Sequence, residues 1–134
     1  MHFTKIVTSF LSNEERFLIL KRSDKVKSMK GLWGGVSGVI EQNEYPLHRA
    51  KTEVFEATGI SEKQVALLKT AKELEVVSEK YSNHGWIVYP FLFAAKEPRI
   101  KLNWENSEYR WVSSHEITDY QTVPSLDKVL ASLM

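Results

Sequence analysis

The sequence has no cysteine among its 134 residues. This absence excludes disulfide bonds and thiol catalysis, and it is typical of proteins that work in a reducing compartment. The sequence also has no apolar run that approaches the roughly 20 residues needed to span a membrane. We therefore expect a cytoplasmic protein with no membrane partner.

An excess of charge of either sign is also missing, because 18 Lys and Arg residues nearly balance 17 Asp and Glu residues. Broad nucleic-acid surfaces usually show a strong basic excess, so we expect a small-molecule partner instead. No G-x-G-x-x-G segment is present, so a bound NAD would be a substrate rather than a redox cofactor. The length and the hydrophobic fraction of 43% predict one globular domain over residues 1–134.

The residue pattern predicts strands and two helices. Segments rich in β-branched and aromatic residues predict strands over 4–11, 16–21, part of 65–77, 85–94 and 108–112. One helix is predicted over Pro46 to Thr58, with proline in its first turn and Gly59 as its stop signal. A second helix is predicted to start at Pro124, and Ser113 or Ser114 is predicted to cap a short turn. This order of elements predicts an α+β layered domain with a mixed sheet.

The first predicted helix has an apolar face and a charged face. The apolar stripe that would pack on the sheet consists of Leu47, Ala50 and Val54. Because a helix turns by about 100° per residue, Arg49, Glu53 and Glu56 project together from another face. Carboxylates one turn apart can hold Mg²⁺, which takes oxygen ligands and keeps several waters. The alternative is a solvated face, where an Arg49–Glu53 pair is worth about 0.2 to 0.5 kcal/mol.

Residues 38–60, GVIEQNEYPLHRAKTEVFEATGI, contain this helix within a longer pattern. The segment resembles the Nudix box, G-x5-E-x7-R-E-U-x-E-E-x-G-U, in which U is an aliphatic residue. Seven of the nine specified positions match: Gly38, Glu44, Glu53, Val54, Glu56, Gly59 and Ile60. The other two hold Thr52 and Ala57 in place of arginine and glutamate. A gapped pattern of this length is far more specific than a lone glycine motif.

The flanking sequence also resembles the Nudix, or MutT-like, hydrolase family. FLILKRS and GLWGGVSG are similar to the strand and glycine turn before the box, with Val36 and Ser37 where proline and glycine are usual. WENSEYRWVSSHEI is similar to the segment that follows it. The resemblance implies a Nudix α/β/α sandwich and Mg²⁺-dependent hydrolysis of a nucleoside diphosphate linked to another moiety, with Mn²⁺ as a substitute. It also allows a homodimer.

The resemblance assigns roles by position. Glu53 would be the catalytic base or a metal ligand, and Glu56 would be a metal ligand. Ser37 would provide its main-chain carbonyl group to the metal. Glu105 lies where a later carboxylate of the family reaches the metals or the water, and Glu108 is the competing candidate.

The two departures allow a different interpretation. Thr52 cannot orient the neighbouring glutamate as an arginine does, and such a loss typically costs about 10- to 100-fold in metal affinity or activity. Arg49, one turn before Glu53, is a candidate replacement, and water or Glu105 is a candidate for the position that Ala57 leaves empty. In the alternative, the domain binds a nucleotide or a protein without cleaving it. The retained carboxylates favour the enzyme.

Three residues are predicted to contact the substrate: Arg22, Trp33 and Arg49. Arg22 belongs to a basic stretch whose charges can meet phosphate oxygens, although most such stretches are solvated loops. Four aromatic residues are candidates for stacking on a base, with burial in the core as the alternative: Trp33, Trp86, Tyr89 and Trp104. Trp111 is expected in the core.

Overall fold

The computed structural model describes residues 1–78, 80–81, 83–96 and 98–134. Within these residues, one sheet contains β1 (His2–Asn13), β2 (Arg16–Arg22), β3 (Trp33–Gly34), β4 (Val36–Val39), β5 (Val65–Thr70), β6 (Leu74–Val77), β7 (His84–Ala95) and β8 (Asn106–Val112). The helices are α1 (Pro46–Thr58) and α2 (Leu126–Ser132), with short 3-10 helices η1 (Glu62–Gln64) and η2 (Ser114–Asp119). No described helix is long and apolar enough to cross a membrane.

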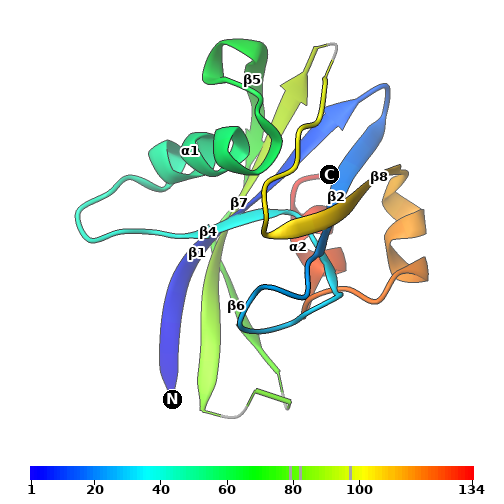
Figure 1. Ribbon diagram of the computed structural model, residues 1–134. Coiled ribbons are helices and arrows are strands. Elements are labelled where there is room, and N and C mark those ends of the chain that lie inside the picture. The colour runs from blue at the N-terminus through cyan, green and yellow to red at the C-terminus, as the bar shows by residue number, and fades with distance from the viewer. Residues whose placement is uncertain (79, 82, 97) are drawn as a thin grey trace.

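Two long strands form the centre of the sheet (Figure 1). β1 and β7 run parallel over eleven residue pairs, from His2 with His84 to Ser12 with Ala94. The other paired strands are antiparallel: β2 and β4 pair with different parts of β1, β5 and β6 with different parts of β7, and β3 and β8 with β2. The sheet is therefore mixed, as predicted.

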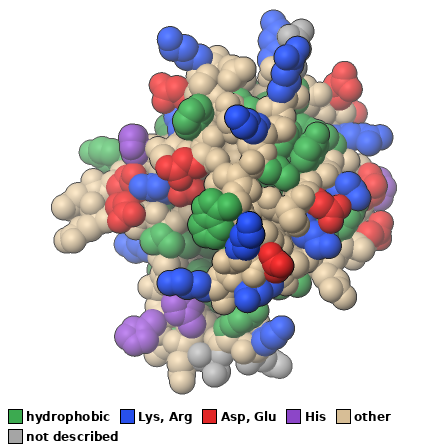
Figure 2. Space-filling model, viewed as in Figure 1, with side chains coloured by type: hydrophobic (Ala, Val, Ile, Leu, Met, Phe, Trp, Pro, Cys, Tyr) green, Lys and Arg blue, Asp and Glu red, His purple; other side chains and the backbone are tan. Residues whose placement is uncertain are grey.

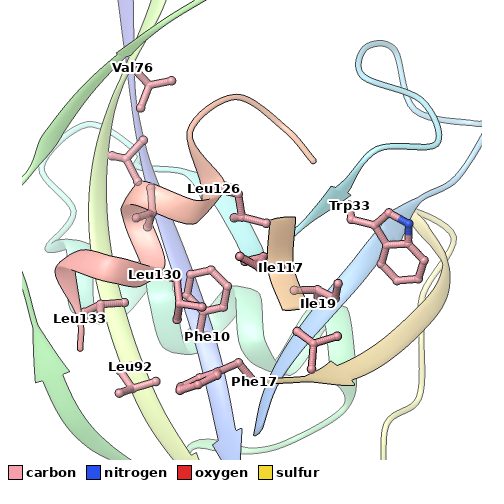
Figure 3. Packing of buried hydrophobic residues seen from close by; sticks show 13 residues of the cluster. Phe10, Phe17, Ile19, Trp33, Val76, Leu92, Ile117, Leu126, Leu130 and Leu133 are labelled. Carbon is pink, nitrogen blue, oxygen red and sulfur yellow. The ribbon is translucent and has the colours of Figure 1, made fainter. Parts of the chain in front are cut away.

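Each face of the sheet is covered by one helix, which gives three layers. The side chains of β1 alternate between the two faces. Val7 and Leu11 therefore pack under α1, and Phe10 packs under α2. Figure 3 shows the core cluster under α2, in which Phe10 and Leu92 from the sheet pack with Leu126 and Leu130 from α2 and with Leu133 directly after it. The predicted α+β sandwich is confirmed, and its layers leave α1 and α2 on opposite sides of the strands.

The helix boundaries follow local backbone chemistry. α1 has the predicted bounds, and it ends where Gly59 adopts φ of 77° and donates its N–H to the Phe55 carbonyl oxygen at 2.8 Å. The prediction that the second helix starts at Pro124 is wrong by two residues, because Ser125 has φ of 61° and α2 begins at Leu126. Of the two predicted caps, Ser113 is the one that precedes the turn, and it forms a capping box at η2.

Candidate functional site

A cavity of about 440 Å³ is lined by both α-helices, by the sheet and by the segment before β8. Its volume lies in the range of roughly 300 to 1,000 Å³ that is usual for small-molecule sites. Five predicted site residues from four separate segments line it: Arg22, Ser37, Glu53, Glu56 and Glu105. The fold therefore brings together carboxylates that are about fifty positions apart in the sequence.

Glu53 is packed tightly against Gly38 of β4. A Cβ atom added at Gly38 would overlap the carboxyl group of Glu53, so the close approach of α1 to β4 needs a residue without a side chain. Only 12% of the Glu53 side chain is exposed. The first glycine of the 38–60 pattern therefore creates the space that its central glutamate occupies.

Arg49 connects two carboxylates beside the cavity. Its Nε and Nη2 atoms donate to Oε1 and Oε2 of Glu44 at 2.8 and 3.0 Å, and its Nη1 atom donates to Glu53 Oε1 at 3.1 Å. The bond to Glu44 raises the pKa of Arg49, and its bond to Glu53 adds to this effect. Figure 2 shows acidic side chains gathered around a basic one beside α1. Arg49 itself is not among the residues that line the cavity.

The charge around Glu53 is mostly negative on the cavity side. Burial raises the pKa of Glu53, and the charges of Glu56 and Glu105 raise it further, while the hydrogen bond from Arg49 lowers it. Glu56 and Glu105 are therefore both close enough to Glu53 to repel its carboxylate electrostatically. A cation in the cavity would relieve this repulsion.

The structure separates the two candidates for the later carboxylate. Glu105 lines the cavity, and its Oε1 atom accepts a hydrogen bond from Asn103 Nδ2 at 3.1 Å. Glu108 instead forms ion pairs with Lys21 and Arg110, each at 3.4 Å, and is not among the lining residues. Placement therefore favours Glu105.

Arg22 brings a positive charge to the same cavity, close enough to Glu105 for the two charges to interact. Its Nε and Nη2 atoms donate to the Ser28 carbonyl oxygen at 3.2 and 3.0 Å, which anchors the guanidinium group. Burial lowers the pKa of Arg22, and the nearby Glu105 carboxylate raises it. Ser37 is exposed on β4, and its hydroxyl group lies 3.0 Å from that of Thr8.

The aromatic candidates separate by burial. Trp33 is only 8% exposed and meets Tyr120 edge to face, so the structure places it in the core and not on the cavity wall. The contact of Trp33 with a substrate stays a prediction. Trp86 lines the cavity, whereas Trp104 is 60% exposed outside it. The sequence analysis selected Trp33 and not Trp86 as a substrate contact, because a sequence pattern alone does not locate a cavity.

Position 57 is buried rather than open to the cavity mouth. Ala57 is 6% exposed and packs in the core under α1. It also lines an adjoining space of about 40 Å³ together with Glu53 and Glu105, which line the larger cavity as well. About 10 to 15 Å³ of such volume is enough to hold one water, so water has room beside these carboxylates.

The donor set fits a hard divalent cation that keeps part of its water shell. Within the described residues, no group of three or more His, Asp or Glu side chains is placed to form, on its own, a cage that could hold a metal ion. Mg²⁺ seldom uses such cages, because it is usually held by one or two carboxylates together with waters and substrate phosphates. Glu53, Glu56 and Glu105 supply oxygen atoms of this kind at one end of the cavity.

Comparison with known proteins identifies the architecture. A model of the NUDIX domain matches residues 2–133. Among curated proteins, none matches the sequence significantly. The MutT protein of Methanosarcina mazei is similar in structure, with a TM-score of 0.74, 24% identity, and coverage of 96% of this chain and 91% of that one.

Two further solved structures are similar at lower identity. The Ap4A hydrolase of C. elegans has a TM-score of 0.75 and 14% identity, with coverage of 96% of this chain and 93% of that one. A bifunctional NMN adenylyltransferase/ADP ribose pyrophosphatase of Francisella tularensis has a TM-score of 0.76 and 18% identity. The match covers 97% of this chain and 40% of that protein. At these identities the likeness establishes the fold.

Proposed function

The chain belongs to the NUDIX domain family, and from this premise we propose that it is a hydrolase of a nucleoside diphosphate linked to another moiety. The reaction is the Mg²⁺-assisted attack of water on the pyrophosphate linkage. The similar structures include a protein named for Ap4A hydrolysis and one named for ADP-ribose pyrophosphatase activity, which makes substrates of this class the first to test.

One observation supports this proposal more than any other. Glu53 and Glu56 from α1 and Glu105 from the segment before β8 line one end of a ligand-sized cavity that also contains Arg22. Carboxylates contribute little to stability by lying near one another, and burial together with the charges of Glu56 and Glu105 raises the pKa of Glu53. Such a grouping is expected where cations and phosphates bind.

Each residue has a role in this proposal. Glu53, Glu56, Glu105 and the Ser37 carbonyl group would hold Mg²⁺, which when bound offsets charge on the phosphate oxygens. Glu53 orders the attacking water and accepts its proton. Arg22 pairs with a phosphate oxygen, because it lines the same cavity and lies close enough to Glu105 for the two charges to interact. Arg49 positions Glu53, as its hydrogen bond at 3.1 Å indicates.

The test is product release from Ap4A, ADP-ribose, nucleotide sugars and oxidised nucleoside triphosphates. Each compound is assayed with Mg²⁺, with Mn²⁺ and with a chelator. We expect turnover of at least one compound with either metal and none with the chelator. Absence of metal-dependent turnover across the panel would contradict the proposal.

Gly38→Ala tests the link between the tight packing of α1 and the reaction. The added methyl group would overlap the Glu53 carboxyl group and force it to move, so we expect turnover to fall by about 10- to 100-fold. The measurement is kcat in Gly38→Ala, Glu53→Gln and the double variant. If Gly38 acts through Glu53, the double variant loses little beyond Glu53→Gln, whereas fully additive losses would show that Gly38 acts elsewhere.

A second candidate function is a module that binds a nucleotide or a protein partner without cleaving it. The observation that favours this alternative is the buried Ala57, which leaves the 40 Å³ space without the carboxylate that the family pattern specifies. This alternative predicts ligand affinity by calorimetry without metal-dependent turnover. The panel above therefore distinguishes the two functions.

A further inference from the structure

The cavity has an apolar half in addition to the half that holds the carboxylates. Six residues from three strands and α2 form it: Ile6, Val76, Trp86, Val88, Leu126 and Val129. All six belong to the core cluster under α2 or pack against it, so they form one continuous wall. Figure 3 shows Val76 and Leu126 of this wall on different elements of that cluster.

The apolar half offers few hydrogen-bonding groups to a ligand. Five of its six side chains are hydrocarbon, and the indole Nε1 atom of Trp86 is the one polar side-chain atom among these six residues. The strand segments that contribute to it are paired with one another, Ile6 with Val88 and Val76 with Trp86. Pro124, which also lines the cavity, has no N–H to donate.

Trp86 is held in place by aromatic neighbours. The ring of His84 meets it edge to face at 5.0 Å, and the ring of Tyr81 does so at 6.0 Å. His84 is in turn fixed by a hydrogen bond between its Nε2 atom and the Thr4 hydroxyl group at 3.0 Å. Trp86 is only partly buried although its neighbours fix it, which leaves part of the indole free for a ligand.

We propose that this apolar half holds the base of the nucleotide by shape and contact with Trp86, so that the protein does not distinguish adenine from guanine. The inference rests on the proposed function in one respect, because the diphosphate is assigned to the half with Arg22. A site that reads a polar edge can reject the wrong group by about 10,000-fold or more, but an apolar pocket cannot. Both purines also present an acceptor at N7, so one indole N–H would not separate them.

The test measures binding of compounds that cannot be hydrolysed at the diphosphate. The α,β-methylene analogues of ADP and GDP, and methylenediphosphonate as the probe without a base, are titrated by calorimetry into the wild-type protein with Mg²⁺. We expect the two nucleotide analogues to have Kd values within about 10-fold of each other. Methylenediphosphonate is expected to bind at least about 10-fold more weakly, because it lacks the base.

Variants of Trp86 test whether this residue contacts the base. Trp86→Leu keeps an apolar side chain but removes the ring, and it is expected to weaken both nucleotide analogues by about 10-fold without changing methylenediphosphonate. Trp86→Phe keeps an aromatic ring and is expected to retain most of the wild-type affinity for the two nucleotide analogues. Trp104→Ala is the matched control, since Trp104 is 60% exposed outside the cavity, and it should change none of the three.

The outcomes separate this inference from the proposed function. A preference of about 100-fold or more between the adenine and guanine analogues, or equal weakening of all three probes by Trp86→Leu, would overturn it. Failure of all three probes to bind would also overturn it. The expected binding pattern without turnover in the substrate panel would instead support the base site and contradict hydrolysis.

Discussion

Glu53→Gln is expected to lower metal-dependent kcat by roughly 1,000-fold while leaving the fold intact. Glutamine has nearly the same shape, so it can occupy the space beside Gly38, and its amide oxygen can still accept the bond from Arg49. It cannot accept a proton from water, and it is a poorer ligand for Mg²⁺. Burial raises the pKa of Glu53, so removing its charge also relieves a desolvation cost. The measurements are kcat at saturating Mg²⁺ and the Tm of the variant.

Glu108→Gln is the matched control, because it removes one carboxylate that pairs with Lys21 and Arg110 outside the cavity. Its kcat is expected to stay within about 3-fold of the wild-type value, since exposed ion pairs contribute little. Retention of turnover in Glu53→Gln would show that the reaction does not need the Glu53 carboxylate. Equal losses in both variants would point to a general electrostatic effect instead.

Arg49→Ala is expected to lower turnover and Mn²⁺ affinity by about 10- to 100-fold. The substitution removes two hydrogen bonds to Glu44 and one to Glu53, so Glu53 would lose the contact that sets its orientation. Mn²⁺ binding is measured by electron paramagnetic resonance without substrate, which separates metal affinity from catalysis. Lys51→Ala, on the same helix, is the control, because Lys51 forms none of the ion pairs found within the described residues.

Moving the arginine provides a sharper test than removing it. In the Arg49→Ala background, Thr52→Arg places a guanidinium group at the position that the family pattern specifies, next to Glu53 in the sequence. We expect at least about a 10-fold recovery of Mn²⁺ affinity and turnover. A double variant as weak as Arg49→Ala would show that Arg49 acts through its own packing. Unchanged Mn²⁺ affinity in Arg49→Ala alone would show that Arg49 does not position Glu53 for metal binding.

Much of the fold could be predicted because its signals are local. The 46–58 helix has proline at its start, glycine after its end and an apolar stripe, and these three signals depend only on neighbouring residues. The long 65–77 segment was predicted to be only partly strand, and the structure divides it into β5 and β6. The start of α2 was misplaced because the left-handed φ of Ser125 is not encoded in a pattern of apolar residues.

The candidate site was less predictable, because its geometry depends on distant packing. Helical spacing predicts that Arg49 and Glu53 share one face, but it does not indicate that Arg49 also donates two hydrogen bonds to Glu44. Nor could the sequence rank Trp86 above Trp33, since only the folded chain shows which one faces the cavity. Trp111, expected in the core, is only partly buried against it.

The parallel pairing of β1 with β7 affects how the chain folds during its synthesis. The partners His2 and His84 are 82 positions apart, so the first strand must wait for most of the chain before it can join its central neighbour. Contacts of such long range slow folding, because loop closure must precede any stabilisation that they provide. A nascent chain that ends before β7 exposes the apolar side chains of β1 without that partner, and chains truncated there are expected to aggregate.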